Sequence, residues 1–183
     1  MDTELGSAVV LITGVMAAGK STVAELLAGQ LPRAAHVRGD VFRRMVVSGR
    51  EELLPEETAE ARAQLELRYR LSALVADEYA CHGWTAVVQD IVLGEDLGRY
   101  VARVRTRPLY VVVLAPSTAA VQSREAERPK TGYGAAWTVD ALDRALREET
   151  PRIGLWLDTS DQTPDQTVSA ILDNLPAARV QAG

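Results

Sequence analysis

Short apolar runs alternate with amphipathic stretches along most of the chain. Five of these runs are rich in β-branched residues and nearly continuous, as is typical of strands that are buried on both faces of a parallel sheet. They are AVVLIT at 8–13, AAHV at 34–37, TAVVQ at 85–89, LYVVVL at 109–114 and GLWLD at 154–158. The pattern therefore predicts a sheet of parallel strands.

Helices are predicted between the strands. In 21–31 the apolar residues follow the three-and-four spacing of one helix face, and Pro32 ends the pattern. The longest pattern, at 55–83, has a proline and acids at its start and a glycine at its end, which favours a helix. Shorter helices are predicted near 96–105, 117–127, 138–149 and 164–175.

The alternation of strands and helices indicates the fold class. Such elements are joined by right-handed crossovers, so we predict an α/β, three-layer fold in which helices cover both faces of an open, five-stranded parallel sheet. Ligands of such sheets gather at the carboxyl ends of the strands. A length of 183 residues suits one domain, and a content of 47% hydrophobic and 25% charged residues argues against disorder over most of the length.

A phosphate-binding loop joins the first strand to the first helix. Residues 14–21, GVMAAGKS, satisfy the pattern G-x-x-x-x-G-K-S/T in the strand-to-helix context that it requires. The glycines permit a tight path that points backbone amides at phosphate oxygens, and the helix N-terminus adds its positive dipole end. The alternative is a glycine turn capped by Ser21 with Lys20 in solvent, which the context disfavours. The predicted nucleotide-binding residues are Gly14, Val15, Met16, Ala17, Ala18, Gly19, Lys20, Ser21 and Thr22.

Two side chains of this loop have predicted chemical roles. Lys20, one of only two lysines in the chain, can neutralise charge on the β- and γ-phosphates as the terminal bond breaks, so it is predicted to be catalytic. The Ser21 hydroxyl can ligate magnesium. The predicted cofactors are therefore ATP and Mg²⁺.

Charge and composition exclude several classes of protein. With a net charge of −5, the chain lacks the broad basic surface that nucleic-acid binding requires. No apolar segment approaches the roughly 18 residues that are needed to cross a bilayer. We therefore expect neither a nucleic-acid partner nor a membrane span. The only cysteine, Cys81, forms no internal disulfide and favours a cytoplasmic location. The only asparagine, Asn174, is not part of the N-K-x-D segment with which GTPases bind guanine, and helicases need longer chains, so a small kinase remains.

With these motifs the chain resembles the P-loop kinases of small molecules, in particular the chloramphenicol phosphotransferase-like group, over residues 8–175. Gluconate, shikimate and adenylylsulfate kinases and zeta toxins share this plan, in which the second strand ends in an acid. The counterpart here is VRGDVFRR at 37–44. The resemblance implies a single kinase domain at 1–183 with a flexible N-terminus at 1–7, an acceptor-side region at about 41–83 and a lid at about 124–138.

The resemblance also implies that Asp40 and Arg43 handle the acceptor. A carboxylate that faces the γ-phosphate can accept the proton of the acceptor hydroxyl or orient that hydroxyl for in-line attack, so Asp40 is predicted to be catalytic. A helix N-cap is the alternative role for Asp40. Arg43 and Arg44 diverge on a helix, so at most one of them faces the acceptor, and we prefer Arg43. Further contacts for acidic substrate groups are offered by Arg62, Arg68 and Arg70, among which helical spacing does not select.

Asp90 ends another apolar strand, where P-loop proteins keep an acid for magnesium or its waters. We predict a metal role for Asp90, with acceptor binding and a cap of the following loop as open alternatives. Chloramphenicol kinases have two adjacent acids here, whereas the first residue of the pair in this chain is Gln89.

A lid is implied after the fourth strand. Arg124 and Arg128 are four residues apart on a predicted helix, and an arginine of a lid can stabilise charge on the transferring phosphoryl group, so both are predicted to be catalytic. The alternative is that Glu125 and Glu127 neutralise them on an exposed helix. Trp137, beside the lid, either lines a pocket or fills the core.

These features together predict an ATP-dependent phosphotransferase that moves the γ-phosphoryl group to a hydroxyl of a small molecule. The acceptor is an antibiotic or a nucleoside- or sugar-like metabolite, and antibiotic resistance is one physiological role that fits. Two alternatives stay open: a zeta-toxin-like kinase of a nucleotide sugar, and a nucleotide-binding regulatory protein without transfer activity. The sequence does not select the acceptor or the oligomeric state.

Overall fold

A parallel sheet forms the centre of the protein. The computed structural model describes residues 5–127 and 137–181, and its sheet has five strands in the order β2-β3-β1-β4-β5, all paired in parallel. The strands are Ala8–Gly14 (β1), Ala34–Arg38 (β2), Thr85–Gln89 (β3), Leu109–Leu114 (β4) and Leu155–Leu157 (β5). Each strand agrees with its predicted apolar run to within one residue at either end. The predicted α/β fold with a five-stranded parallel sheet is confirmed.

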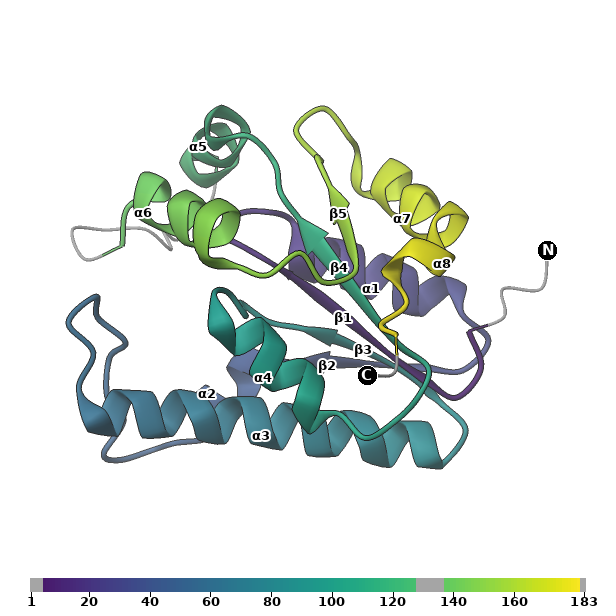
Figure 1. Ribbon diagram of the computed structural model, residues 1–183, viewed down its shortest axis with the longest axis horizontal. Coiled ribbons are helices and arrows are strands. Elements are labelled where there is room, and N and C mark those ends of the chain that lie inside the picture. Colours follow the sequence, from purple (N-terminus) through teal and green to yellow (C-terminus); the bar gives the residue numbers. More distant parts are fainter. Residues whose placement is uncertain (1–4, 128–136, 182–183) are drawn as a thin grey trace.

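Helices cover both faces of the sheet (Figure 1). The longest, α3, packs with α4 against one face, whereas α1 and α7 pack together on the other face. The helices are Lys20–Gln30 (α1), Gly39–Arg44 (α2), Ala59–Cys81 (α3), Glu95–Arg103 (α4), Thr118–Ala126 (α5), Val139–Arg144 (α6), Pro164–Asp173 (α7) and Leu175–Ala178 (α8), with a π-helical turn at Ala145–Glu149 (η1) that continues α6.

The core explains why the strands read as continuous apolar runs. Every residue of β1, β3 and β4 is buried, because each of these strands has a neighbour on both edges and helices on both faces. Leu11 of β1 lies between Val88 of β3 and Val111 of β4, and all three side chains are fully buried. Burial on both faces removes the polar alternation that a half-exposed strand would show.

Two helix boundaries differ from the prediction. The helix expected at 55–83 begins at Ala59, because the Thr58 hydroxyl accepts a hydrogen bond from the Ala61 amide at 3.0 Å and so caps the first turn. The proline and acids at 55–57 precede the helix. The helix that carries Arg43 and Arg44 begins at Gly39, before Asp40, and this short α2 packs against α3. Among the described residues, none of the helices combines the length and the apolar character needed to cross a bilayer.

Candidate active site

The loop between β1 and α1 has the shape of an anion cradle. Three of its residues have positive φ: Gly14 at 144°, Ala17 at 58° and Gly19 at 93°. A Cβ on Gly14 would lie 2.4 Å from the carbonyl oxygen of Leu114, so only glycine fits there. Left-handed Ala17 costs about 1 kcal/mol, and strain of this kind is typical of ligand clamps.

The first turn of α1 points its amides into this loop. Gly19 is the N-cap, and the first bond of the helix runs from the Val23 amide to the Gly19 carbonyl at 3.0 Å. The amides of the first turn, including those of Ser21 and Thr22, therefore have no acceptor within the helix. Such amides, together with the positive end of the helix dipole, bind phosphate groups.

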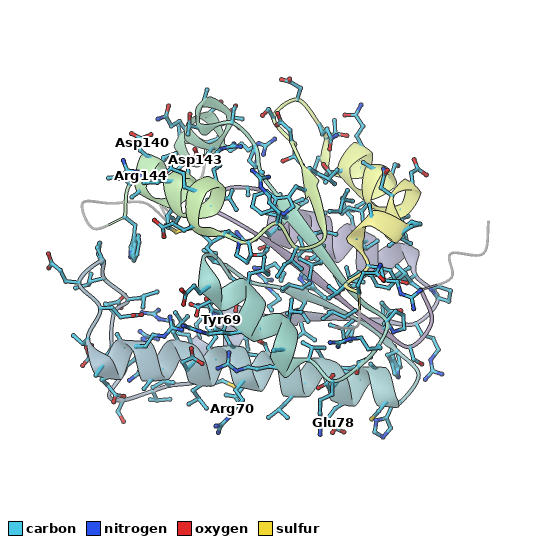
Figure 2. The ribbon with its side chains drawn as sticks, viewed as in Figure 1. Tyr69, Arg70, Glu78, Asp140, Asp143 and Arg144 are labelled. Carbon is cyan, nitrogen blue, oxygen red and sulfur yellow. The ribbon has the colours of Figure 1, made fainter. Side chains whose placement is uncertain are left out.

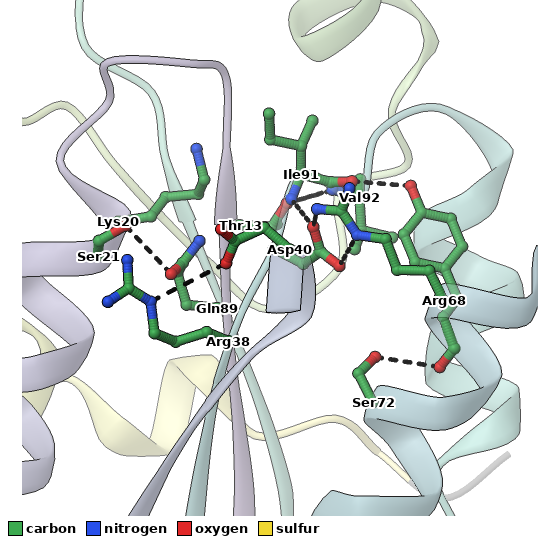
Figure 3. Close-up of polar contacts among 12 residues, drawn as sticks. Thr13, Lys20, Ser21, Arg38, Asp40, Arg68, Ser72, Gln89, Ile91 and Val92 are labelled. Atoms are coloured by element: carbon green, nitrogen blue, oxygen red, sulfur yellow. Dashed lines mark hydrogen bonds and ion pairs between the residues drawn. The ribbon is translucent and has the colours of Figure 1, made fainter. Parts of the chain in front are cut away.

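Lys20 and Ser21 are held on the inner side of the loop (Figure 3). Lys20 is 7% exposed, and its Nζ donates a hydrogen bond to the Val15 carbonyl at 2.6 Å. The Ser21 hydroxyl donates to Oε1 of Gln89, at the end of β3, over 3.1 Å. The three side chains line a pocket of about 470 Å³. The remaining lining residues are Met16, Ala17, Gly19, Thr22, Arg38, Asp40, Arg68, Ile91 and Arg124, whereas Gly14, Val15 and Ala18 of the loop do not line it.

Asp40 faces the same pocket from the other side. It lies within α2, whose N-cap is Arg38, so the alternative in which Asp40 is the N-cap is wrong. Its Oδ2 lies 3.1 Å from Nη2 of Arg44, and its Oδ1 lies 3.9 Å from Nε of Arg38. Although the side chain is 43% exposed, Oδ1 is buried and accepts no hydrogen bond within the described part of the chain. Asp40 therefore brings a carboxylate to the wall of the phosphate pocket.

Arg43 and Arg44 diverge as expected. Arg44 contacts Asp40, whereas Arg43 turns away and lies 2.8 Å from Oε2 of Glu52. Arg43 lines a separate pocket of about 210 Å³ with Phe42 and other residues of α2 and α3. Arg43 as an acceptor contact stays a prediction, and Arg44 is the neighbour of Asp40 that sequence reasoning did not prefer.

The structure shows the partners of Asp90, while its predicted roles in metal and acceptor binding stay predictions. The Asp90 side chain is fully buried and lines none of the three pockets around α3 and the phosphate loop. Arg68 of α3 donates hydrogen bonds to both of its oxygens, over 2.9 Å for the Nε to Oδ2 pair, and the Ile91 amide donates to Oδ1 over 2.7 Å. Burial raises the pKa of Asp90, and the charge and hydrogen bonds of Arg68 oppose that rise. Its contact with the Ile91 amide agrees with the alternative of a loop cap.

The pleat of β3 explains why Gln89, and not Asp90, meets Ser21. Successive side chains of a strand point to opposite faces of the sheet. Gln89 reaches Ser21 of α1, whereas Asp90 reaches Arg68 of α3. Sequence analysis missed the Gln89 contact, although the strand period could have indicated it.

The three candidate arginines of α3 lie in different surroundings. Arg68 is 17% exposed and lines the phosphate pocket beside its partner Asp90. Arg62 donates to both oxygens of Asp96 and to Glu66. Figure 2 shows Arg70 on the outer side of α3, pointing away from the sheet.

Arg124 lies at the far end of the phosphate pocket. Its guanidinium donates to the carbonyls of Thr159 and Ser160, in the loop after β5. Arg124 therefore ties α5 to that loop. Arg128 and most of the expected lid lie outside the described residues, so the role of Arg128 stays a prediction.

Comparison with known proteins agrees with this geometry. A family model described as AAA domain matches residues 9–151. An unliganded sugar kinase from Janibacter sp. HTCC2649 superposes with a TM-score of 0.67 at 21% identity, over 93% of this chain and 95% of that one. The tunicamycin resistance protein of Deinococcus radiodurans gives 0.68 at 15% identity, over 96% and 99%. The APS kinase CysC of Mycobacterium tuberculosis, in complex with AMPPNP and APS, gives 0.64 at 20% identity, over 92% and 97%. No curated protein matches the chain significantly.

Proposed function

The chain belongs to the AAA-domain family, and from this premise we propose that it is an ATP-dependent phosphotransferase that acts on a hydroxyl of a small molecule. One observation carries the proposal: Asp40 and the phosphate loop line one pocket, and a buried oxygen of Asp40 accepts no hydrogen bond within the described residues. A site that only binds phosphate needs no such carboxylate. A site that transfers a phosphoryl group to a hydroxyl needs a group that accepts the proton of that hydroxyl.

The residues present fit a nucleotide and a divalent cation. The amides at the start of α1 and Lys20 would hold the β- and γ-phosphates, and Arg124 with the loop after β5 would adjoin the base. The hydroxyl of Ser21 and the amide oxygen of Gln89 are oxygen donors of the kind that Mg²⁺ accepts. When bound, the cation supplies positive charge to the phosphate oxygens.

Each residue has a defined part in the transfer. Asp40 orients the acceptor hydroxyl and accepts its proton at the carboxylate as the acceptor oxygen bonds to the γ-phosphorus. The bond between that phosphorus and the β–γ bridging oxygen breaks, and ADP leaves. Lys20 neutralises the negative charge on the phosphate oxygens during this step.

Labelled ATP, magnesium and a library of hydroxylated metabolites and antibiotics test the proposal. We expect a phosphorylated product with the native protein and a loss of transfer of at least about a hundredfold in Lys20→Ala and in Asp40→Asn. Asp40→Asn should retain ATP binding in calorimetry, because the loop is intact. Asp173→Asn, an exposed aspartate at the end of α7, is the matched control and should retain full transfer.

Two results would contradict the proposal. Full turnover in Asp40→Asn would show that Asp40 is not the proton acceptor, and it is this role that distinguishes the site from a simple phosphate site. Binding of ATP without transfer to any acceptor would favour the regulatory alternative, which the neutral Gln89 beside Ser21 also suits.

A further inference from the structure

A second pocket adjoins the phosphate pocket and is lined mainly by apolar side chains. Its volume is about 380 Å³, and it lies among α3, α4, α6 and the loop before α3. Its apolar lining includes Leu53, Leu65, Leu93 and Trp137, and it shares Met16, Arg68 and Ile91 with the phosphate pocket. A molecule held here is therefore placed to present a hydroxyl to the phosphate loop, and the volume suits a small ligand.

Trp137 contributes an apolar wall. Its indole N–H donates to the Leu53 carbonyl over 2.7 Å, which joins the segment before α6 to the loop before α3. The one polar atom of the indole is thereby satisfied by the main chain, so the ring presents only apolar surface to a ligand. Tyr69 is similar, since its hydroxyl donates to the Ile91 carbonyl over 2.7 Å.

The cationic side chains of this pocket are already neutralised. Arg68 is paired with the fully buried Asp90, and Arg62 is paired with Asp96, whose side chain is 13% exposed. Hydrogen bonds to Asp96 raise the pKa of Arg62. A carboxylate or phosphate of a ligand would have to compete with these acids for either arginine. Drawing Arg68 away would leave the fully buried Asp90 without its cationic partner, which is costly, whereas Asp96 would keep Arg99 at 3.3 Å.

The acidic side chains at the rim are in the opposite situation. Glu57 and Glu149 line the pocket, are exposed, and form no ion pair with any residue that the structure describes. Their charge opposes the entry of an anion and favours a cation. The apolar walls, the neutralised arginines and the two rim acids, which have no ion pair in 5–127 or 137–181, all select against a negatively charged ligand.

We propose that the acceptor is an alcohol with an apolar body and no anionic group, either neutral or positively charged, and that it binds in the pocket beneath Trp137. The inference rests on the proposed function, because it treats the occupant of this pocket as the molecule whose hydroxyl meets Asp40. It sets this chain apart from kinases of acidic acceptors.

Displacement of a neutral fluorophore, Nile red, measures the selectivity without ATP or magnesium. The competitors are three naphthyl alcohols that differ only in a distal trimethylammonium, amide or carboxylate group. The ammonium and amide compounds should displace the dye, and the carboxylate should bind at least about tenfold more weakly than either. Equal or tighter binding of the carboxylate would overturn the inference.

Variants place the binding in this pocket. Ala145 lines it, so Ala145→Phe should fill the space and abolish dye binding while ATP binding and the thermal unfolding midpoint are retained. Ala102→Phe, at an exposed position of α4 outside the pocket, is the matched control and should bind the dye normally. The rim acids should also make the ammonium compound displace the dye at lower concentration than the amide. Glu57→Gln combined with Glu149→Gln should remove that difference. Dye binding that persists in Ala145→Phe would show that the pocket is not the site and would refute the proposal.

The same alcohols then separate the two proposals. If they bind with the expected preference and none is phosphorylated when magnesium and ATP are added, the ligand class stands and phosphotransfer fails. If the native protein phosphorylates an acidic acceptor instead, phosphotransfer stands and the inference about the acceptor fails.

Discussion

At the scale of single residues, the pair of Asp90 and Arg68 supports the site from within the fold, with Arg68 on the wall of the phosphate pocket and Asp90 buried behind it. The two side chains bury opposite charges between β3 and α3, next to the segment that carries Asp40. A buried pair of this kind is costly to break from one side only, because the remaining charge loses its partner. The pair therefore fixes the position of its neighbours.

Asp90→Asn should lower the free energy of unfolding by about 3–5 kcal/mol, since it leaves the Arg68 guanidinium buried without a carboxylate. Urea denaturation measures this loss. The double variant Arg68→Met with Asp90→Asn should recover part of it, because no charge is then left unpaired. A single variant as stable as the native protein would show that the pair does not constrain the fold.

Gly39 is the contact between this pair and the segment of Asp40. A Cβ on Gly39 would lie 1.9 Å from Oδ2 of Asp90, so Gly39→Ala must displace one of the two. We expect an unfolding free energy lower by about 1–3 kcal/mol and weaker phosphotransfer, measured by denaturation and by the labelled-ATP assay. Gly29→Ala in α1 is the matched control. It has no atom within 4 Å of the added Cβ and should be neutral or stabilising by about 0.5–1 kcal/mol. Equal stability of the two variants would contradict this account.

Sequence reasoning predicted the phosphate loop residue by residue, but it did not predict the partners of Asp90. The loop is a local motif in which each position has a fixed purpose. The partner of Asp90 lies 22 residues earlier in the chain, and three arginines of the same helix were equally eligible. Only the packing of α3 on β3 selects Arg68.

At the scale of elements, burial decided which parts the sequence could predict. The strands were predicted to within one residue at either end because their side chains are apolar on both faces. The helix α2 has six residues, of which only Gly39 is buried, so no apolar period indicates its bounds. The start of α3 was placed too early because Pro55 and the acids after it carry start signals, whereas the Thr58 hydroxyl makes the capping bond.

Thr58→Ala tests this boundary. Loss of the hydroxyl leaves the Ala61 amide without its side-chain acceptor, so the free energy of unfolding should fall by about 1 kcal/mol. Thermal or urea unfolding measures the change. Thr58→Ser keeps the acceptor and should be close to the native protein, and a loss of the same size in both variants would argue against capping.

At the scale of the whole molecule, His36 should make stability depend on pH. It lies in the edge strand β2, and histidine is the side chain whose charge changes near neutral pH. Burial, and then the charge of Arg38, lower the pKa of His36 below its ordinary value, although Glu25 and Asp40 act in the opposite direction. The folded protein therefore binds its proton less readily than the unfolded chain does.

The sign of the effect follows from this difference. Stability from His36 is fully present above the unfolded pKa of about 6.5 and is lost as the pH falls below it toward the folded value. Urea midpoints measured at pH 7.5 and pH 5.5 should differ more in the native protein than in His36→Gln. His82→Gln, which removes an exposed histidine, should retain the native difference. If the two urea midpoints of His36→Gln differ as much as those of the native protein, the account in which the fold holds His36 as a neutral imidazole is contradicted.

The order of the strands has an evolutionary consequence. The phosphate loop follows β1, the central strand, whereas Asp40 follows β2, which is paired along one edge only. Most of the walls of the apolar pocket likewise come from helices and loops rather than from strands. During evolution, the helices and loops that line the apolar pocket can change while β1 and the phosphate loop are retained. Under the proposed function, the acceptor specificity is thus free to diverge faster than the binding of phosphate.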